Sequence, residues 1–281
     1  MEGWPSDLSP DAEQALEAAG QRVRDRALDR CEAILTAYEE TETAQFVYDR
    51  AFSPNDLFPK RQRRPKTDSA LLTEQVYREF GSDESTLDAL LDLSILSQEY
   101  YDVLDDTVDG DVAPDRDDEA ILTSQLLLPR IHERLAAIHP DASTFWAGRI
   151  ERLVTAPQLE RTTEPSGESY LALLDRQSNL YGALTGLAAL AADTDDATVD
   201  DAERLGRTIY RHDHFVHDRL QFEDGQRETW NAAALLSEEE MVDRLRTWRE
   251  TVAEITASFD DERATVLRGL VALDIDAWRR Q

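Results

Sequence analysis

Residues 86–111 read TLDALLDLSILSQEYYDVLDDTVDGD, an apolar run that ends in a cluster of aspartates. Between Leu87 and Leu96 the apolar residues recur at helical steps, which predicts a helix with one buried face. Four aspartates follow at steps of three, one and three: Asp102, Asp105, Asp106 and Asp109. These steps place the carboxylates on one helix face, where they repel one another unless divalent cations such as Mg²⁺ bridge them. The segment therefore predicts a metal site, and the alternative is a solvated acidic face.

The rest of the chain shows helical patterns and no alternating strand pattern. A helix is expected to start near Asp68, and others are predicted over 10–48 (as one helix or two), 117–138, 142–155, 168–191, 199–222, 237–258 and 261–278. The linkers are short, and no low-complexity stretch divides the chain. We therefore predict an all-α fold that forms one domain, residues 1–281.

The composition indicates a halophilic protein. The chain has 59 acidic and 30 basic residues, for a formal net charge of −29, and its only lysines are Lys60 and Lys66. Because salt screens the repulsion between such charges, this balance suits a salt-rich cytosol and a haloarchaeal type of protein. The N-terminus lacks a signal-peptide pattern, no apolar run approaches the roughly 20 residues that span a bilayer, and Cys31 is the single cysteine. We expect a cytoplasmic protein without a membrane span.

A second polar stretch, YRHDHFVHDRLQFEDG at 210–225, repeats the spacing of the aspartates. Its residues at steps of three, one and three are His214, His217, Asp218 and Gln221. If this stretch and the aspartate helix face each other, they enclose one polar cavity. Two alternatives stay open. One is a polar helix surface, and the other is a zinc hydrolase, whose motif requires an aspartate where this chain has Val216.

The segment KRQRRPK at 60–66 holds both lysines and three arginines. Its charge contrasts with that of the remaining chain, which would repel a nucleic-acid backbone, so we expect no nucleic-acid partner. A small, highly charged anion fits better. Arg61 and Arg64 can each form forked hydrogen bonds to phosphate oxygens.

These elements resemble the trans-isoprenyl diphosphate synthases over about residues 57–225. They occur in that family's order: a basic segment ending in Arg-Pro, an apolar helix ending in Asp-Asp-x-x-Asp, and a later polar helix. The resemblance implies an isoprenoid-synthase helical bundle around a central cavity, in which Mg²⁺ held by the first motif grips an allylic diphosphate. The motif residues are Asp105, Asp106 and Asp109. The positions that the resemblance assigns to isopentenyl diphosphate are Arg61, Arg64 and Gln98.

The resemblance extends to two later helices. DRQSNLYGALTGLAAL (175–190) is similar to the family's Lys-Thr helix. Arg176, or Gln177 if the register differs by one residue, takes the place of its catalytic lysine. On the second polar helix, His217 and Asp218 take metal-binding positions. His214 belongs to the pair that replaces the family's Phe-Gln, which implies a place beside the substrate.

Tyr100 and Tyr101 lie five and four residues before Asp105. By resemblance to the family, two bulky rings at these positions limit the depth of the product pocket. They imply a product of about C15 to C20. The alternative is that both rings are ordinary core residues.

The resemblance implies a short-chain prenyltransferase that condenses isopentenyl diphosphate with an allylic diphosphate. It also implies a homodimer, or a heterodimer with a related synthase. Two departures from the family raise alternatives. His217 and Gln221 replace two aspartates of the second motif, and the paired arginines that the family has shortly after the first motif are missing, with Arg116 as the only cation near. The alternatives are a non-catalytic or regulatory subunit of such a synthase, and an enzyme of the terpene-cyclase kind.

Overall fold

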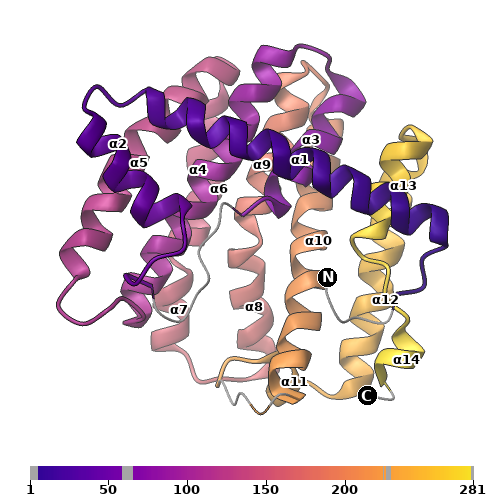
Figure 1. Ribbon diagram of the computed structural model, residues 1–281. Coiled ribbons are helices and arrows are strands. Elements are labelled where there is room, and N and C mark those ends of the chain that lie inside the picture. The colour runs from indigo at the N-terminus through magenta and orange to yellow at the C-terminus, as the bar shows by residue number, and fades with distance from the viewer. Residues whose placement is uncertain (1–5, 59–65, 224, 226–228, 280–281) are drawn as a thin grey trace. The chain divides into compact units, whose positions relative to one another are not determined.

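The computed structural model describes residues 6–58, 66–223, 225 and 229–279, and every regular element within them is a helix (Figure 1). The all-α prediction is therefore confirmed for this part of the chain. The helices are α1 (Pro10–Thr36), α2 (Thr41–Val47), η1 (Tyr48–Phe52), α3 (Asp68–Phe80), α4 (Glu84–Asp109), α5 (Asp117–Ile138), α6 (Ala142–Val154), α7 (Ala156–Thr162), α8 (Gly167–Gln177), α9 (Asn179–Ala191), α10 (Asp196–Glu223), α11 (Ala232–Leu235), α12 (Glu238–Ile255), η2 (Thr256–Ser258), α13 (Asp261–Gly269) and α14 (Ile275–Arg279). None of the described helices combines the length and the apolar character that crossing a bilayer requires.

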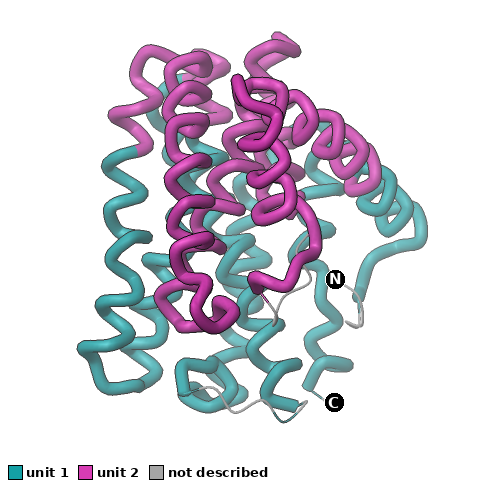
Figure 2. The backbone as a smooth tube through the Cα atoms, turned by 60° about the vertical axis from the view of Figure 1, so that its left-hand side comes forward, with its two compact units in different colours: residues 1–19, 147–186, 195–281 teal, residues 20–146, 187–194 magenta. Residues whose placement is uncertain are grey.

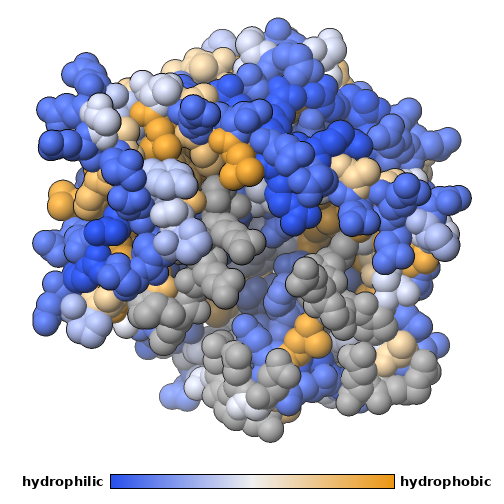
Figure 3. Space-filling model, viewed as in Figure 1, coloured by the Kyte–Doolittle hydropathy of each residue, from blue (hydrophilic) through white to orange (hydrophobic). Residues whose placement is uncertain are grey.

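The chain forms two compact units (Figure 2). The first contains residues 1–19, 147–186 and 195–281, and the second contains residues 20–146 and 187–194. On the face of the protein drawn in Figure 3, most of the coloured side chains are hydrophilic and the apolar patches are small, as the net charge of −29 leads one to expect.

Helix α4 is the central element of the second unit and packs against α3 and α5. It begins where the Asp83 carboxylate accepts a hydrogen bond from the Thr86 backbone N–H, and it ends at Gly110, whose φ of 74° is left-handed. Its leucines are fully buried along most of its length. The predicted amphipathic helix and the position of its aspartates at the C-terminal end are therefore confirmed.

The buried carboxylate of Asp92 joins three helices of this unit. Its side chain is 1% exposed. It accepts hydrogen bonds from Arg30 Nε at 2.6 Å, Arg30 Nη2 at 2.7 Å and Arg134 Nε at 2.7 Å. Because Arg30 belongs to α1 and Arg134 to α5, this one side chain fixes both helices against α4.

The first unit contains a core formed by α8, α10, α12 and the C-terminal residues. Its buried members include Tyr170, Phe215, Leu245 and Trp278. Helix α10 packs along α12 through this core. Of the polar residues of α10 that the sequence analysis singled out, Asp218 is buried against this core, whereas the side chain of His217 is about half exposed.

The predicted helix over 168–191 is wrong in one respect, because the chain breaks into α8 and α9 at Ser178. The Ser178 hydroxyl and the Asn179 side-chain amide both donate to the carbonyl oxygen of Asp175, each at 2.8 Å. Side chains that bond nearby carbonyls in this way compete with the helical backbone pattern. Similarly, the predicted helix over 261–278 is interrupted between α13 and α14, and α7 was not predicted as a separate helix.

Helices α9 and α10 approach each other closely at Gly206. A Cβ atom added there would lie 2.3 Å from Thr185 Oγ1 and 2.5 Å from the carbonyl oxygen of Tyr181. Only glycine therefore fits at this crossing. The close approach sets the position of the polar end of α10 relative to the helix break at Ser178.

Candidate functional site

The acidic end of α4 presents the first predicted motif. Asp106 is fully buried, Asp105 is half-buried and Asp109 is exposed. Carbonyl oxygens at the end of a helix carry partial negative charge, so a buried carboxylate in this turn requires a positive partner. Three carboxylates at this spacing supply the oxygen ligands that Mg²⁺ prefers, so the residues present fit that ion.

The end of the basic segment lies on the same helix. The Lys66 backbone N–H donates to Glu99 Oε1 at 3.1 Å, and the Lys66 ammonium forms an ion pair with Asp102. Both partners lie within two turns before Asp105. Arg61 and Arg64, which the sequence analysis assigned to diphosphate binding, lie outside the described residues.

Gln98 and the two tyrosines also belong to this part of α4. Gln98 is buried, and its Nε2 donates to Asp102 Oδ1 at 3.3 Å. The rings of Tyr100 and Tyr101 meet edge to face, with centroids 5.0 Å apart. Burial raises the pKa of both phenols, so they stay protonated near neutral pH. The structure thus places Gln98 and both rings within two turns of the carboxylates.

Helix α10 carries two pairs of aspartate and histidine, each four residues apart. His217 and Asp213 are both about half exposed, and His217 Nδ1 lies 3.3 Å from the Asp213 carbonyl oxygen and 3.6 Å from its Oδ2. The Asp213 carboxylate raises the pKa of the His217 imidazole above its ordinary value. In the second pair, His214 Nε2 lies 3.7 Å from Asp218 Oδ1. Sequence reasoning did not assign a role to Asp213, although its spacing to His217 is that of neighbours on a helix.

The carboxylate of Asp218 is engaged in hydrogen bonds with groups of neighbouring helices. Its side chain is 6% exposed, and Oδ2 accepts hydrogen bonds from the Tyr170 hydroxyl at 2.7 Å and from the Ala232 backbone N–H at 2.6 Å. Burial, with the nearby carboxylate adding to it, raises the pKa of Tyr170, so this hydroxyl remains a donor. Asp218 therefore joins α10 to α8 and to the start of α11.

The two candidates for the family lysine, Arg176 and Gln177, are the last two residues of α8, directly before the break at Ser178. Arg176 Nη1 donates to Thr155 Oγ1 at 3.0 Å, and Arg176 lines a groove of about 630 Å³ between α6 and α8. Gln177 lies seven residues after Tyr170, so it shares the helix face that contacts Asp218. Asp175, which sequence reasoning missed, accepts hydrogen bonds from Arg207 and Arg211 of α10 and so fixes α8 beside α10.

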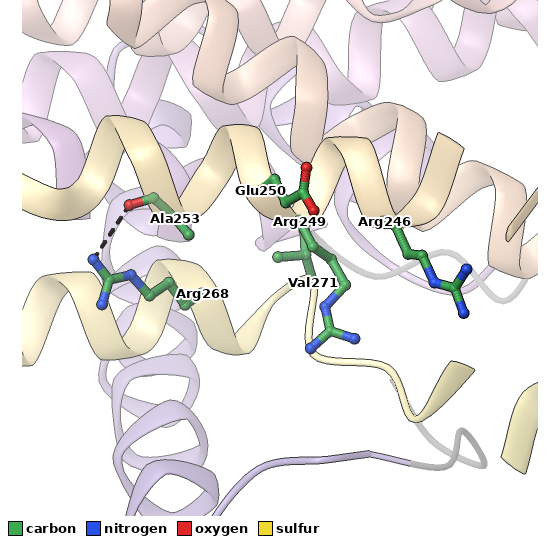
Figure 4. Close-up of a pocket in the computed structure, with 6 residues that line it drawn as sticks. All are labelled: Arg246, Arg249, Glu250, Ala253, Arg268 and Val271. Atoms are coloured by element: carbon green, nitrogen blue, oxygen red, sulfur yellow. Dashed lines mark hydrogen bonds between the residues drawn. The ribbon is translucent and has the colours of Figure 1, made fainter. Parts of the chain in front are cut away.

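A separate hollow of about 370 Å³ in the first unit gathers three arginines, Arg246, Arg249 and Arg268 (Figure 4). Arg249 donates to the Leu273 carbonyl at 2.7 Å and to Asp7 at 2.5 Å. Arg268 donates to carbonyl oxygens at the end of α12, including that of Ala253. Because two of the three guanidinium groups bind backbone or side-chain acceptors of the fold, we assign this hollow a structural role.

No three histidine, cysteine or acidic side chains within the described ranges are arranged to hold a metal ion together. The carboxylates of α4 nevertheless match Mg²⁺ in chemistry. The candidate residues of α10 do not match Mg²⁺, which prefers oxygen ligands. Two of them, His214 and His217, are imidazoles, and the carboxylate of the third, Asp218, already accepts hydrogen bonds from α8 and α11.

The fold is that of known isoprenoid enzymes, although no protein-family profile and no curated protein sequence matches the chain. A geranylgeranyl pyrophosphate synthetase from the archaeon Geoglobus acetivorans has a TM-score of 0.71 at 14% identity, covering 98% of this chain and 100% of its own. A geranyltransferase from Legionella pneumophila has a TM-score of 0.70 at 13% identity, with 92% and 96% covered. A heterotetrameric geranyl pyrophosphate synthase from mint, studied as a deletion mutant, has a TM-score of 0.57 at 13% identity, with 94% and 100% covered. The predicted isoprenoid-synthase fold is confirmed.

Proposed function

We propose that the protein is a prenyltransferase that condenses isopentenyl diphosphate with an allylic diphosphate and requires Mg²⁺. One observation carries the proposal: the end of the basic segment lies on α4 directly before the aspartates, through the contacts of Lys66 with Glu99 and Asp102. A cationic segment and a carboxylate cluster in one place suit a substrate that bears a diphosphate and a metal ion.

The groups on α4 and in the basic segment have distinct tasks in this reaction. When bound by the three motif aspartates, Mg²⁺ neutralises the charge of the diphosphate leaving group. The allylic carbon–oxygen bond breaks, the isopentenyl double bond attacks the resulting cation, and the released pyrophosphate accepts the proton that is lost. Gln98 supplies an amide beside the motif, and Arg61 and Arg64 are proposed to hold isopentenyl diphosphate in line for attack.

The tyrosine pair is proposed to set the product length. Tyr100 and Tyr101 lie one turn before Asp105 and form a rigid edge-to-face pair. Rings at this depth stop a growing chain at farnesyl or geranylgeranyl length.

Gln177 is the better candidate for the position of the family lysine, because the guanidinium of Arg176 donates a hydrogen bond to Thr155. A neutral amide there grips the allylic diphosphate more weakly than a lysine does.

The partner of this protein is proposed to be a second copy or a related synthase. Ile121 and Leu122 are adjacent on α5 and are 52% and 53% exposed, in a chain whose formal net charge is −29. Sedimentation of the full chain in molar KCl tests this point. Ile121→Glu should shift the protein to a smaller species, and an unchanged species would remove α5 from the interface.

The reaction itself is tested with purified protein in molar KCl and Mg²⁺, supplied with labelled isopentenyl diphosphate and each short allylic diphosphate. Elongated product is expected, and Asp105→Asn should lower its rate by more than about 100-fold. Asp117→Asn is the matched control, since it makes the same charge change at an exposed position of the same unit. Full activity of the Asp105 variant would refute the assignment.

A regulatory subunit is the second candidate function, and the imidazoles in place of carboxylates on α10 favour it. The mint enzyme of similar fold is a heterotetramer. In that case the protein alone gives no elongation, but it changes the product of an added synthase with which it co-purifies. Pyrophosphate release without isopentenyl diphosphate would instead identify a terpene-cyclase kind of enzyme.

A further inference from the structure

We propose that a groove between α8 and α10 binds inorganic diphosphate without a metal ion. The groove has a volume of about 420 Å³ and lies within the first unit. We call it the arginine groove, and its lining residues are Asp175, Asp200, Glu203, Arg204, Arg207 and Arg211. The inference goes beyond the proposed function, because none of these residues takes part in the proposed reaction.

Basic side chains gather at this groove, although acidic residues outnumber basic ones by 59 to 30 in the whole chain. Three arginines and three carboxylates line it. The neighbouring groove of about 630 Å³ shares Asp175 and adds Arg152 and Arg176 against Glu151. Together the two grooves hold five arginines and four carboxylates, so arginines outnumber carboxylates here. Such a local excess of positive charge attracts anions.

The Asp175 carboxylate does not use all the donors that meet it. One oxygen, Oδ1, accepts a hydrogen bond from Arg207 Nη2 at 2.6 Å and another from Arg211 Nη2. In both arginines, Nε is buried and has no hydrogen-bond partner within the described residues. Because a buried donor without an acceptor costs free energy, the remaining N–H groups of the two guanidinium forks suit an added oxyanion.

The charges around Arg211 lead to the same conclusion. Burial lowers the pKa of its guanidinium and the charge of Arg207 lowers it further, against the opposite effect of Asp175. One carboxylate therefore does not offset the two cations. Glu203 supplies little more, because its carboxylate accepts a hydrogen bond from Arg149 at 3.0 Å and lies 3.9 Å from Arg207.

The geometry of the arginine groove favours an anion with two phosphoryl groups. Arg207 and Arg211 are four residues apart, so they are neighbours on one face of α10. The stem of Arg207 lies against α9, since a Cβ atom added to Gly182 would be 2.5 Å from its Cγ. Planar guanidinium forks bind phosphate oxygens in pairs, and two forks one turn apart match the two phosphoryl groups of diphosphate. All the lining residues are charged, so the groove offers no apolar wall to a hydrocarbon tail.

The test is isothermal titration calorimetry of the full chain with pyrophosphate and EDTA, at the lowest KCl concentration at which circular dichroism shows the folded protein. EDTA removes the divalent ions through which the α4 aspartates would bind diphosphate. Arg207→Gln and Arg211→Gln should each weaken binding by more than about tenfold. Arg246→Gln is the matched control, because it makes the same charge change at a half-exposed arginine of the same unit, and it should leave the affinity unchanged.

Asp200→Asn distinguishes anion binding from a loss of packing. Arg207 and Arg211 also hold α8 beside α10, so their replacement loosens this contact. Asp200 is an exposed carboxylate in the lining of the same groove. Removing its repulsion should strengthen binding by roughly threefold, with the gain shrinking as KCl is raised.

Four results would overturn the proposal. They are the absence of binding, unchanged affinity in both arginine variants, no gain in Asp200→Asn, and binding of geranyl diphosphate more than about tenfold tighter than that of pyrophosphate. Unchanged affinity in the arginine variants would place the anion elsewhere, as on the basic segment. Because the titration requires no turnover, its outcome is independent of whether the protein proves to be a prenyltransferase.

Discussion

Replacing Asp92 by asparagine should destabilise the protein far more than the same change at its neighbour Asp88. Asp92 is 1% exposed and receives three charge-assisted hydrogen bonds from Arg30 and Arg134. The substitution leaves two guanidinium groups, each about one-fifth exposed, facing a neutral amide. Removing one partner of a buried ion pair costs roughly 3–5 kcal/mol. Asp88 is 35% exposed, where an ion pair contributes about 1 kcal/mol or less.

Chemical denaturation followed by circular dichroism measures the difference. A loss of about 4 kcal/mol also lowers the melting temperature by roughly 10 °C in a chain of this size. Salt gives a second readout, because a buried pair is screened much less than an exposed one. The Asp92→Asn loss should persist from low to molar KCl, while the Asp88→Asn loss should shrink. Equal losses for both variants would show that Asp92 does not hold α1 and α5 on α4.

Three further predictions concern single positions. Burial lowers the pKa of His212 from 6.5 to about 3. Because the unfolded chain then binds more protons, the free energy of unfolding should fall by roughly 2 kcal/mol from pH 7 to pH 5. In His212→Leu, the denaturation midpoint should depend less on pH over this range. Gly206→Ala should cost about 2–4 kcal/mol through the clash with Tyr181, and a normal melting temperature would contradict the tight crossing. Replacing both Tyr100 and Tyr101 by alanine should lengthen the product seen by mass spectrometry; an unchanged length would leave the rings as core.

The sequence predicted the parts of the molecule that depend on local periodicity. The apolar run of α4 and its aspartates share one helical repeat, so their placement follows from spacing alone. The break at Ser178 was not predicted, because it arises from side-chain bonds to the carbonyl of Asp175 that compete with the helix. Spacing also gave no way to choose between Arg176 and Gln177, since the choice depends on the contact of Arg176 with Thr155.

The role of Asp218 could not be predicted for a different reason. Its donors are Tyr170, 48 residues earlier, and the backbone of Ala232, 14 residues later. Only the folded chain brings these groups together. A pattern of polar residues on one helix therefore predicted a polar face without showing that Asp218 supports the packing of α8 and α11.

The supporting role of Asp218 bears on how relatives of this protein should be compared. An aspartate kept at this position secures two neighbouring segments, so it would persist in a lineage that had already lost its catalytic ions. Counting carboxylates in an aligned column then overstates what a divergent enzyme can bind. An aspartate that supports the fold is distinguished from one that binds an ion by the presence of its tyrosine partner, and not by the aspartate alone.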